Sequence, residues 1–362
     1  MKIFKKIAAL VLVAAFVLSL AGCHPKDETA IISGDYKVTS ALYSYYLVMA
    51  DSEAKSIIDN SDDYDTSKKG FSYYKQKIDG KKFETFVKDL ALENCLKHIA
   101  YEKLCDDNKL KLDKDALANA ESQAEYYWSY YGYGQIFQQN GVGYETYKKI
   151  MVNSALADRY FMSLYDVDGT KAVSADDIQK TLDENYAAVY ILSKDYSTEE
   201  KPDVDALKAD LEKYKTRLEA GEDFTAVYND FNGIKEEDNK KEDTKTESSD
   251  KPAPKDENIS IVGSKDTGVA FSLFDKVKEL AVDTVSILHD EEAKCLYIVV
   301  KKDINADSYY KDEYLKSDIL YLLKDEEFEK DITAYAKELD YNVSNYAINQ
   351  FKVKKIYDGT EA

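Results

Sequence analysis

The chain has 362 residues, of which 44% are hydrophobic, so it is long enough to form two domains with a sizeable core. Its formal net charge is −20. A surface this acidic repels phosphate backbones and anionic lipid headgroups, which excludes nucleic acid as an expected partner.

The first 22 residues have the pattern of a bacterial secretory signal. A basic start, "MKIFKK", precedes an apolar stretch at residues 7–20, which is shorter than the roughly 20 residues that span a bilayer. The segment "LAGC" that follows resembles a lipobox, in which Cys23 receives a diacylglyceryl group. We therefore expect residues 1–22 to be removed and acyl chains on Cys23 to anchor the chain at the extracytoplasmic face of the bacterial cell membrane. The alternative is an ordinary signal peptide with a chance cysteine. Residues 23–35 are expected to form a tether.

Residues 36–183 carry a series of helix patterns. After a short strand-like piece, Thr39 or Ser40 can cap the start of a helix. Residues 83–105 contain no Gly or Pro and are apolar on two faces, which is typical of a helix packed between others. Further helices are predicted at residues 112–127, with Asp113 as cap, at 144–165, and at 173–186, with Ser174 as cap.

Aromatic residues gather at the end of the helix predicted for 112–127. Their rings offer a large apolar area with a polar tip, so they could line a groove for apolar peptide segments. The alternative is a core-and-loop cluster in a chain that holds 31 tyrosines. The cluster comprises Tyr126, Tyr127, Trp128, Tyr130, Tyr131 and Tyr133, with Tyr127, Trp128 and Tyr131 as the peptide-binding candidates.

The pattern changes to mixed strands and helices over residues 184–302. The apolar run "AAVYILSKD" predicts a strand, and residues 204–221 predict a one-faced helix that Gly221 ends. Residues 235–258 contain no apolar residue larger than Pro, so we expect a disordered insertion there. A shorter helix is predicted around Phe224, Val227 and Phe231, and strands at 259–263, 284–290 and 294–302, the last two forming a hairpin with His289 in an exposed turn.

The cysteines and histidines indicate neither a disulfide nor a metal site. Cys95 and Cys105 lie ten residues apart in one predicted helix, about 15 Å, which exceeds the ~7 Å that a disulfide spans between Cα atoms. With Cys295 they are interpreted as three buried thiols. No cluster of Cys and His has metal-ligand spacing, and His98 is interpreted as a packed or half-exposed residue of its helix.

Residues 303–362 close the chain with a predicted helix at 309–339 and a strand-like segment, "QFKVKKIY", at 350–357. The helix pattern has no internal Gly or Pro.

Several segments in this order resemble two related families. The segments "VYILSKD", "RLEAGEDFTAVYNDFN" and "LAVDTVSILHDEEAKCLYIVVKK" are similar to the parvulin domain, and "LEAGEDF" is the most specific of these matches. The flanks, "FVKDLALENCLKHIAYEKLCDDNKLKLDKDAL" and "EEFEKDITAYAKELDYNVSN", resemble the SurA and PrsA foldases. The resemblance implies an α+β fold: a mainly helical chaperone lobe built from residues 36–183 and 303–362, with a parvulin-like antiparallel sheet and its helices inserted at 184–302.

The resemblance also implies a membrane-anchored foldase or chaperone that assists the folding of secreted proteins without a cofactor. Active parvulins place two facing histidines beside an apolar slot for the proline ring; here the histidine positions are Tyr190 and Tyr297, and the slot candidates are Phe271, Leu273 and Phe274. Two tyrosines could still hydrogen-bond across the sheet, because each phenol is both donor and acceptor. They would not reproduce an imidazole pair, so we expect weak or absent isomerase activity.

Two other functions stay open from the sequence. The first is an active peptidyl-prolyl cis-trans isomerase of the PrsA type, and the second is a surface lipoprotein that binds a ligand or an envelope partner. The expected partners are unfolded or secreted polypeptides and the membrane through the lipid anchor, and a second copy of the chain, as a homodimer, is a further candidate.

Overall fold

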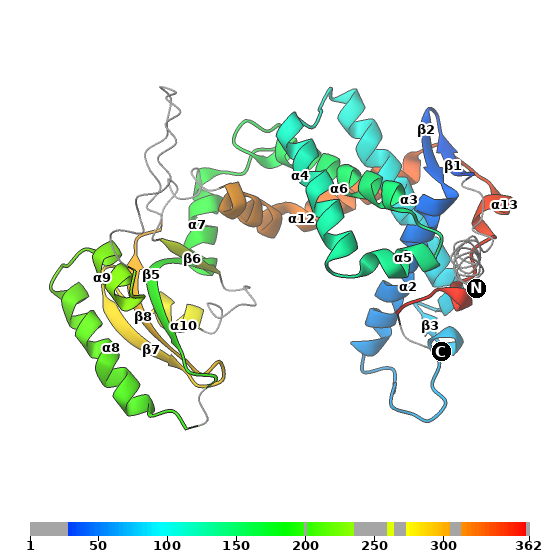
Figure 1. Ribbon diagram of the computed structural model, residues 1–362. Helices are drawn as coiled ribbons and strands as arrows, with labels where there is room; N and C mark the ends of the chain where they lie inside the picture. Colours follow the sequence, from blue (N-terminus) through cyan, green and yellow to red (C-terminus); the bar gives the residue numbers. More distant parts are fainter. Residues whose placement is uncertain (1–27, 199–200, 235–258, 264–272, 305–312, 360–362) are drawn as a thin grey trace, which may run out of the picture. The chain divides into compact units, whose positions relative to one another are not determined.

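The computed structural model describes residues 28–198, 201–234, 259–263, 273–304 and 313–359 (Figure 1). The expected signal segment and the lipidation site Cys23 lie outside the described residues, as do the predicted insertion at 235–258 and Phe271. Within the described part of the chain, no helix combines the length and the apolar character needed to cross a membrane.

The chain divides into two compact units. The first comprises residues 1–170 and 324–362, and the second comprises residues 171–323. The N- and C-terminal segments thus share one unit, and the other is inserted between them. The sequence analysis gave the inserted unit fewer residues, 184–302. The observed unit begins earlier because helix α7 (Ala175–Asn185) contacts strand β5 (Tyr186–Asp195) of its sheet, which nothing in the sequence indicates.

A small sheet forms the start of the first unit. Strands β1 (Thr29–Ser33), β2 (Tyr36–Thr39) and β9 (Asn342–Val343) pair in the order β2-β1-β9. Residues 29–35 therefore do not belong to a tether, contrary to the sequence-based expectation. The physical reason is burial, because Ala30 and Ile31 are fully enclosed in the core.

Five helices build the body of the first unit. The caps are where the sequence placed them: the Thr39 side chain accepts a hydrogen bond from the Leu42 amide, and Asp113 accepts one from the Ala116 amide. Helix α3 contacts both α2 and α6, which confirms that its two apolar faces are packed between other helices. The helices are α2 (Ser40–Asp59), α3 (Phe83–Asp107), α4 (Lys114–Ser129), α5 (Tyr133–Gln139) and α6 (Tyr144–Tyr165).

The C-terminal segment from Lys324 onward completes this unit. It contains the part of helix α12 (Glu313–Glu338) that follows residue 323, then β9, α13 (Asn345–Ile348) and the 3-10 turn η4 (Val353–Lys355). The predicted strand at 350–357 is wrong, because η4 stands in its place. Val353 of η4 is fully buried, so this apolar residue packs into the core from a turn and not from a strand. Short elements between α2 and α3 are η1 (Tyr73–Lys75), β3 (Lys77–Ile78) and β4 (Lys81–Lys82).

The thiols and His98 are structural. Cys95, Cys105 and Cys295 are buried and free, as predicted. The His98 ring is buried, and its Nδ1 lies 2.9 Å from the Tyr46 hydroxyl. Among the described residues, no group of His, Cys, Asp and Glu is arranged to hold a metal ion.

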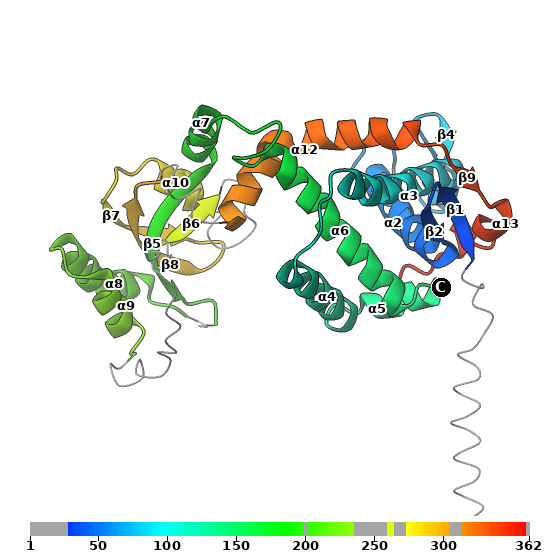
Figure 2. The same cartoon turned by 90° about the horizontal axis from the view of Figure 1, so that it is seen from above.

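The second unit is built on a four-stranded antiparallel sheet in the order β6-β5-β8-β7. Its elements follow in the order strand, helix, short helix, strand, helix and hairpin, and the sequence predicted the four strands and the first two helices. The unit is shown from two sides in Figures 1 and 2. The strands are β5 (Tyr186–Asp195), β6 (Ser260–Gly263), β7 (Val285–Asp290) and β8 (Cys295–Lys302), and the helices are α8 (Val204–Glu219), α9 (Phe224–Phe231) and α10 (Phe274–Lys278).

This sheet has a separate core on each face. On one face the predicted apolar side of α8 packs with α9 against β5 and β8. On the other face α10 packs against the same two strands. Gly221, at φ +82°, ends α8 in a left-handed conformation that favours glycine, as its position predicted.

His289 differs from its predicted place in an exposed turn. It belongs to strand β7 and is half-buried, and its Nε2 lies 2.7 Å from the Tyr196 hydroxyl. The turn of the hairpin follows it, and Lys294 there takes a positive φ of 51°. The hairpin itself is confirmed.

Candidate functional site

Tyr190 and Tyr297, the two residues at the expected histidine positions, lie on opposite faces of the sheet. Side chains alternate between the two faces along a strand, and directly paired residues share a face. Tyr190 pairs with Val300, whereas Tyr297 pairs with Ser193. The two phenols therefore cannot hydrogen-bond to each other, and the expectation that they could is wrong.

Tyr190 lies in the core beneath α8 and α9. Its ring is stacked on Phe224, with 4.5 Å between the ring centroids and 27° between the planes. The ammonium group of Lys302 lies 5.0 Å from the centroid of the Tyr190 ring. These contacts make Tyr190 a packing residue of the α8 face.

Tyr297 lies in the core on the α10 face and is 1% exposed. Its hydroxyl has no hydrogen-bond partner within the described part of the chain. Burial raises the pKa of this phenol, and the adjacent Cys295 thiol raises it further. A neutral, enclosed phenol can neither reach a peptide bond nor polarise one.

The proline-slot candidates on this face are part of its core. Leu273 and Phe274 are both buried and pack in one cluster with Val189, Tyr297 and Val299. The third candidate, Phe271, lies outside the described residues. The described side chains of this face thus form a packed layer that includes both described candidates.

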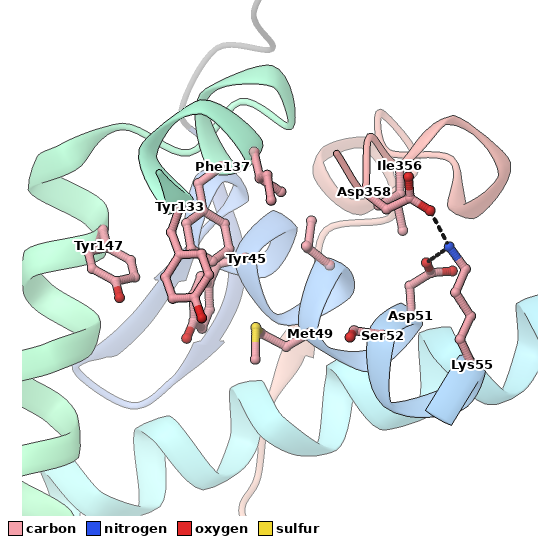
Figure 3. A pocket seen from close by; sticks show the side chains of 12 residues that line it. Tyr45, Met49, Asp51, Ser52, Lys55, Tyr133, Phe137, Tyr147, Ile356 and Asp358 are labelled. Atoms are coloured by element: carbon pink, nitrogen blue, oxygen red, sulfur yellow. Dashed lines mark hydrogen bonds and ion pairs between the residues drawn. The ribbon is translucent and has the colours of Figure 1, made fainter. Parts of the chain in front are cut away.

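A pocket of about 370 Å³ opens in the first unit instead (Figure 3). Helix α2 supplies one wall, α5 and α6 supply a second, and the segment after η4 supplies a third. Aromatic rings gather at one end and charged groups at the other, with Met49 and Ser52 between them. The lining residues are Tyr45, Val48, Met49, Asp51, Ser52, Lys55, Tyr133, Ile136, Phe137, Tyr147, Ile356 and Asp358.

The charged end of the pocket holds one ammonium group between two carboxylates. The Nζ atom of Lys55 lies 2.9 Å from Asp51 and 2.7 Å from Asp358. Burial raises the pKa of the Asp51 carboxyl, and Lys55 offsets only part of that shift. Burial would lower the pKa of Lys55, but its hydrogen bonds to the two carboxylates hold that pKa above the usual range.

The aromatic end continues outward as a row of tyrosines along α4 and the start of α5. We call Tyr126, Tyr127, Tyr130, Tyr131 and Tyr133 the tyrosine row. Tyr126 is stacked on Tyr130 at 5.2 Å, and Tyr131 is stacked on Tyr133 at 6.0 Å. Tyr133 also lines the pocket, so the row and the pocket form one continuous aromatic surface.

The three peptide-binding candidates take different places in this surface. Tyr131 is exposed and Tyr127 is half-buried in the row. The Trp128 ring is half-buried and packs on Tyr144 and Tyr147, with 5.6 and 5.4 Å between the ring centroids. The sequence showed the cluster but not the pocket, because the lining of the pocket joins residues more than 300 positions apart.

Gly134 allows helix α5 to pack closely against Trp128. A Cβ atom at Gly134 would lie 2.8 Å from the Trp128 indole and 2.9 Å from the Trp128 carbonyl oxygen, too close for any other residue. The close approach of α5 to Trp128 places Tyr133 at the junction of the row and the pocket.

Comparison with known proteins gives similar structures but no matching sequence. No protein-family model and no curated protein matches the chain. The chain is similar to the foldase protein PrsA of Streptococcus pneumoniae, with 17% identity over 89% of this chain and 97% of that chain and a TM-score of 0.40. It is also similar to PrsA of Lactococcus lactis, with 14% identity over 90% of this chain and 99% of that chain and a TM-score of 0.40. A third similar structure is PrsA of Bacillus subtilis, with 16% identity over 76% of this chain and 96% of that chain and a TM-score of 0.38.

Proposed function

We propose that the chain is a membrane-anchored extracytoplasmic chaperone of the foldase class, which holds unfolded secreted polypeptides on its helical unit. Its sheet unit acts as a scaffold with weak or absent prolyl isomerase activity. The observation that carries the proposal is the tyrosine row that leads into the pocket of the first unit. The signal pattern and the lipobox-like "LAGC" support the extracytoplasmic, lipid-anchored location.

The tyrosine row has the properties of a surface that binds many different chains. Tyr126, Tyr130 and Tyr131 are 50%, 75% and 55% exposed. Monomeric proteins rarely leave a contiguous apolar patch uncovered unless it binds something. Tyrosine offers a large, rigid contact area at a low cost in conformational entropy, and its hydroxyl hydrogen-bonds to peptide groups. A surface of this kind suits extended apolar segments of varied sequence.

The arrangement of the described residues in the sheet unit supports weak or absent isomerase activity. Catalysis must lower a barrier of about 18–20 kcal/mol, which requires an apolar slot beside polar groups that hold the twisted amide. The only described polar group at an expected catalytic position on the α10 face, the Tyr297 hydroxyl, is enclosed in the core. Tyr190 lies on the other face. The arrangement supports a scaffold role.

Replacing three tyrosines of the row is expected to weaken the chaperone activity. The protein is the chain from residue 24 onward, which keeps every described residue. With Tyr126→Ser, Tyr130→Ser and Tyr131→Ser, about three to ten times more protein should be needed to suppress aggregation of a chemically unfolded client, because exposed aromatic contact area is lost. Light scattering after dilution of the client measures this effect.

The matched control replaces two exposed tyrosines outside the row. Tyr314 and Tyr346 are 85% and 72% exposed. Tyr314→Ser and Tyr346→Ser should leave the suppression of aggregation unchanged. An equal loss in the control, or no suppression by the wild-type chain, would remove the basis for the chaperone function and favour a ligand-binding lipoprotein.

Replacing both tyrosines of the sheet is expected to leave proline-limited refolding of a model protein unchanged. In the Tyr190→Phe plus Tyr297→Phe variant, neither lost hydroxyl contacts a substrate. Tyr297→Phe alone should keep or raise the stability of the second unit, by up to about 1–3 kcal/mol, because a buried hydroxyl without a partner is costly. Double-jump refolding and urea unfolding measure the two effects. An acceleration of refolding that the double variant abolishes would contradict the scaffold role and identify an active isomerase.

A further inference from the structure

We infer that the segment 341–357 of the first unit contacts an anionic membrane surface and turns its exposed lysines toward the lipid headgroups. This inference rests on the proposed lipid anchor at Cys23 and goes beyond it, because it assigns the side of the first unit that faces the membrane. It follows from the place where the anchor joins the fold and from the charge of the chain at that place.

The anchor holds one end of the first unit near the membrane. Glu28, the first described residue, lies five positions after Cys23, and five residues span at most about 18 Å. The Glu28 carbonyl oxygen accepts a hydrogen bond of 2.7 Å from the Ser40 amide, and the Glu28 amide donates one of 3.1 Å to the Ser40 hydroxyl. The anchor is thus tied to the start of α2, and the surface around that point is kept close to the headgroups.

The segment 341–357 packs at this same end of the unit. The Ser344 amide donates a hydrogen bond of 2.8 Å to the Ala30 carbonyl oxygen in β1. The Phe351 ring packs on Tyr43 in the first turn of α2, with 6.2 Å between the ring centroids. Helix α13, which lies between these two contacts in the sequence, is beside β1 in both views (Figures 1 and 2). The segment therefore belongs to the end of the unit that carries the anchor.

The segment is basic in an acidic chain. It contains three lysines and no Asp or Glu, whereas the whole chain has a formal net charge of −20. All three side chains are exposed, and none of them forms an ion pair within the described part of the chain. These lysines are Lys352, Lys354 and Lys355, which we call the anchor-end lysines.

The acidic residues that border the segment lie apart from it or are few. Asp340 is at the opposite end of β1, where its carbonyl oxygen accepts a hydrogen bond of 2.8 Å from the Ser33 hydroxyl. Asp358 lies 2.7 Å from the ammonium group of Lys55. Among the residues placed at the anchor end above, one is acidic, Glu28, and three are lysines.

An anionic bilayer attracts such a segment. Clustered lysines respond to the negative potential of a membrane surface, which falls off within a Debye length of about 8 Å. Only a segment that the anchor already holds close can use this attraction, while the acidic remainder of the surface is repelled. Tyr346 in α13 is 72% exposed, and a tyrosine ring with its polar tip favours the boundary between water and lipid. An acidic segment of a client is a poorer partner, because the acidic surface repels it and no anchor holds it there.

Acetylation of lysines tests the inference in the lipid-bearing chain. The chain with acyl groups on Cys23 is incorporated into vesicles of phosphatidylcholine alone, or of equal parts phosphatidylcholine and phosphatidylglycerol, and mass spectrometry gives the acetylation rate of each lysine. We expect the anchor-end lysines to react about three to ten times more slowly on the vesicles that contain phosphatidylglycerol. Raising the salt concentration should remove this protection.

Lys68 is the internal reference of this experiment. Its side chain is 75% exposed, and it follows the far end of α2, whose 20 residues span about 30 Å. It should react at the same rate on both kinds of vesicle.

A charge-removing variant assigns the contact to the segment. Enzymatic iodination of Tyr346 is the measurement, because it does not need the lysines. In the wild type it should be about three to ten times slower on the vesicles that contain phosphatidylglycerol, and the variant should remove this difference. The variant is Lys352→Gln, Lys354→Gln and Lys355→Gln. The matched control makes the same change of charge at three exposed lysines that follow α2, and it should keep the difference. The control is Lys68→Gln, Lys69→Gln and Lys75→Gln.

The outcomes separate this inference from the proposed anchor. A chain that does not float with vesicles of either composition would overturn both. If the chain floats with both but the anchor-end lysines react equally on both, or if the two triple variants behave alike, the inference alone fails and the anchor stands. Protection of these lysines by an added acidic polypeptide, without a difference between the lipids, would overturn the inference in favour of a polypeptide site.

Discussion

Phe161→Ala is expected to lower the free energy of unfolding of the first unit by about 3–5 kcal/mol, the usual cost of removing a fully buried phenylalanine. Phe161 is completely enclosed. Its ring lies 5.0 Å from Tyr165 of the same helix and 5.1 Å from Phe328 of α12, in an edge-to-face arrangement with the latter. Such contacts add to the area buried. The substitution thus removes one of the ring contacts between α6 and the C-terminal helix.

The single tryptophan of the chain makes this effect measurable. Trp128 lies in α4 of the first unit, so its fluorescence during urea unfolding reports on that unit. The control is Tyr346→Ala, which removes an exposed ring and should change the free energy by less than about 0.5 kcal/mol. A loss below about 1 kcal/mol for Phe161→Ala would show that α12 does not complete this core.

Leu211→Ala is expected to destabilise the second unit by about 2–5 kcal/mol. Leu211 is the buried centre of the apolar side of α8 and packs with Phe224, Leu296 and Ile298 on one face of the sheet. Removing its side chain leaves a cavity between the helix and β8. The cost depends on how far the surrounding side chains close that cavity.

Two probes distinguish the units in this experiment. For Leu211→Ala, circular dichroism should show an unfolding transition at a lower urea concentration than in the wild type. The urea midpoint reported by Trp128 fluorescence should stay at its wild-type value. The control on the same helix is Lys213→Ala, since the Lys213 side chain is 74% exposed and its loss should be nearly neutral. If Leu211→Ala lowered the urea midpoint from Trp128 fluorescence as much as the midpoint from circular dichroism, the conclusion that the Leu211 core belongs to the second unit alone would be wrong.

Local features of the chain could be predicted from the sequence because their causes are local. Thr39, Asp113 and Ser174 cap helices by accepting hydrogen bonds from amides three residues away. The spacing of apolar residues fixed the buried side of α8, and a left-handed glycine, Gly221, fixed its end. The element order of the second unit followed from these signals.

The candidate site could not be predicted in the same way, because it depends on register and on distant contacts. The two tyrosines occupy matching positions in similar segments, but pairing of Tyr190 with Val300 sends them to opposite faces. A shift of one residue in register would have reversed this outcome. The pair of Asp51 and Lys55 is visible as a helical i, i+4 spacing, whereas nothing in the sequence brings Asp358 to it.

The wall of the pocket that carries Ile356 and Asp358 has a consequence for the order in which the first unit folds. The hydrogen bond between Lys55 and Asp358 closes a loop of 303 positions, which includes the whole second unit. Contacts of such separation form late, because the entropy of the intervening chain must be lost first. The tyrosine row, which residues 126–133 supply, therefore forms before the pocket is complete.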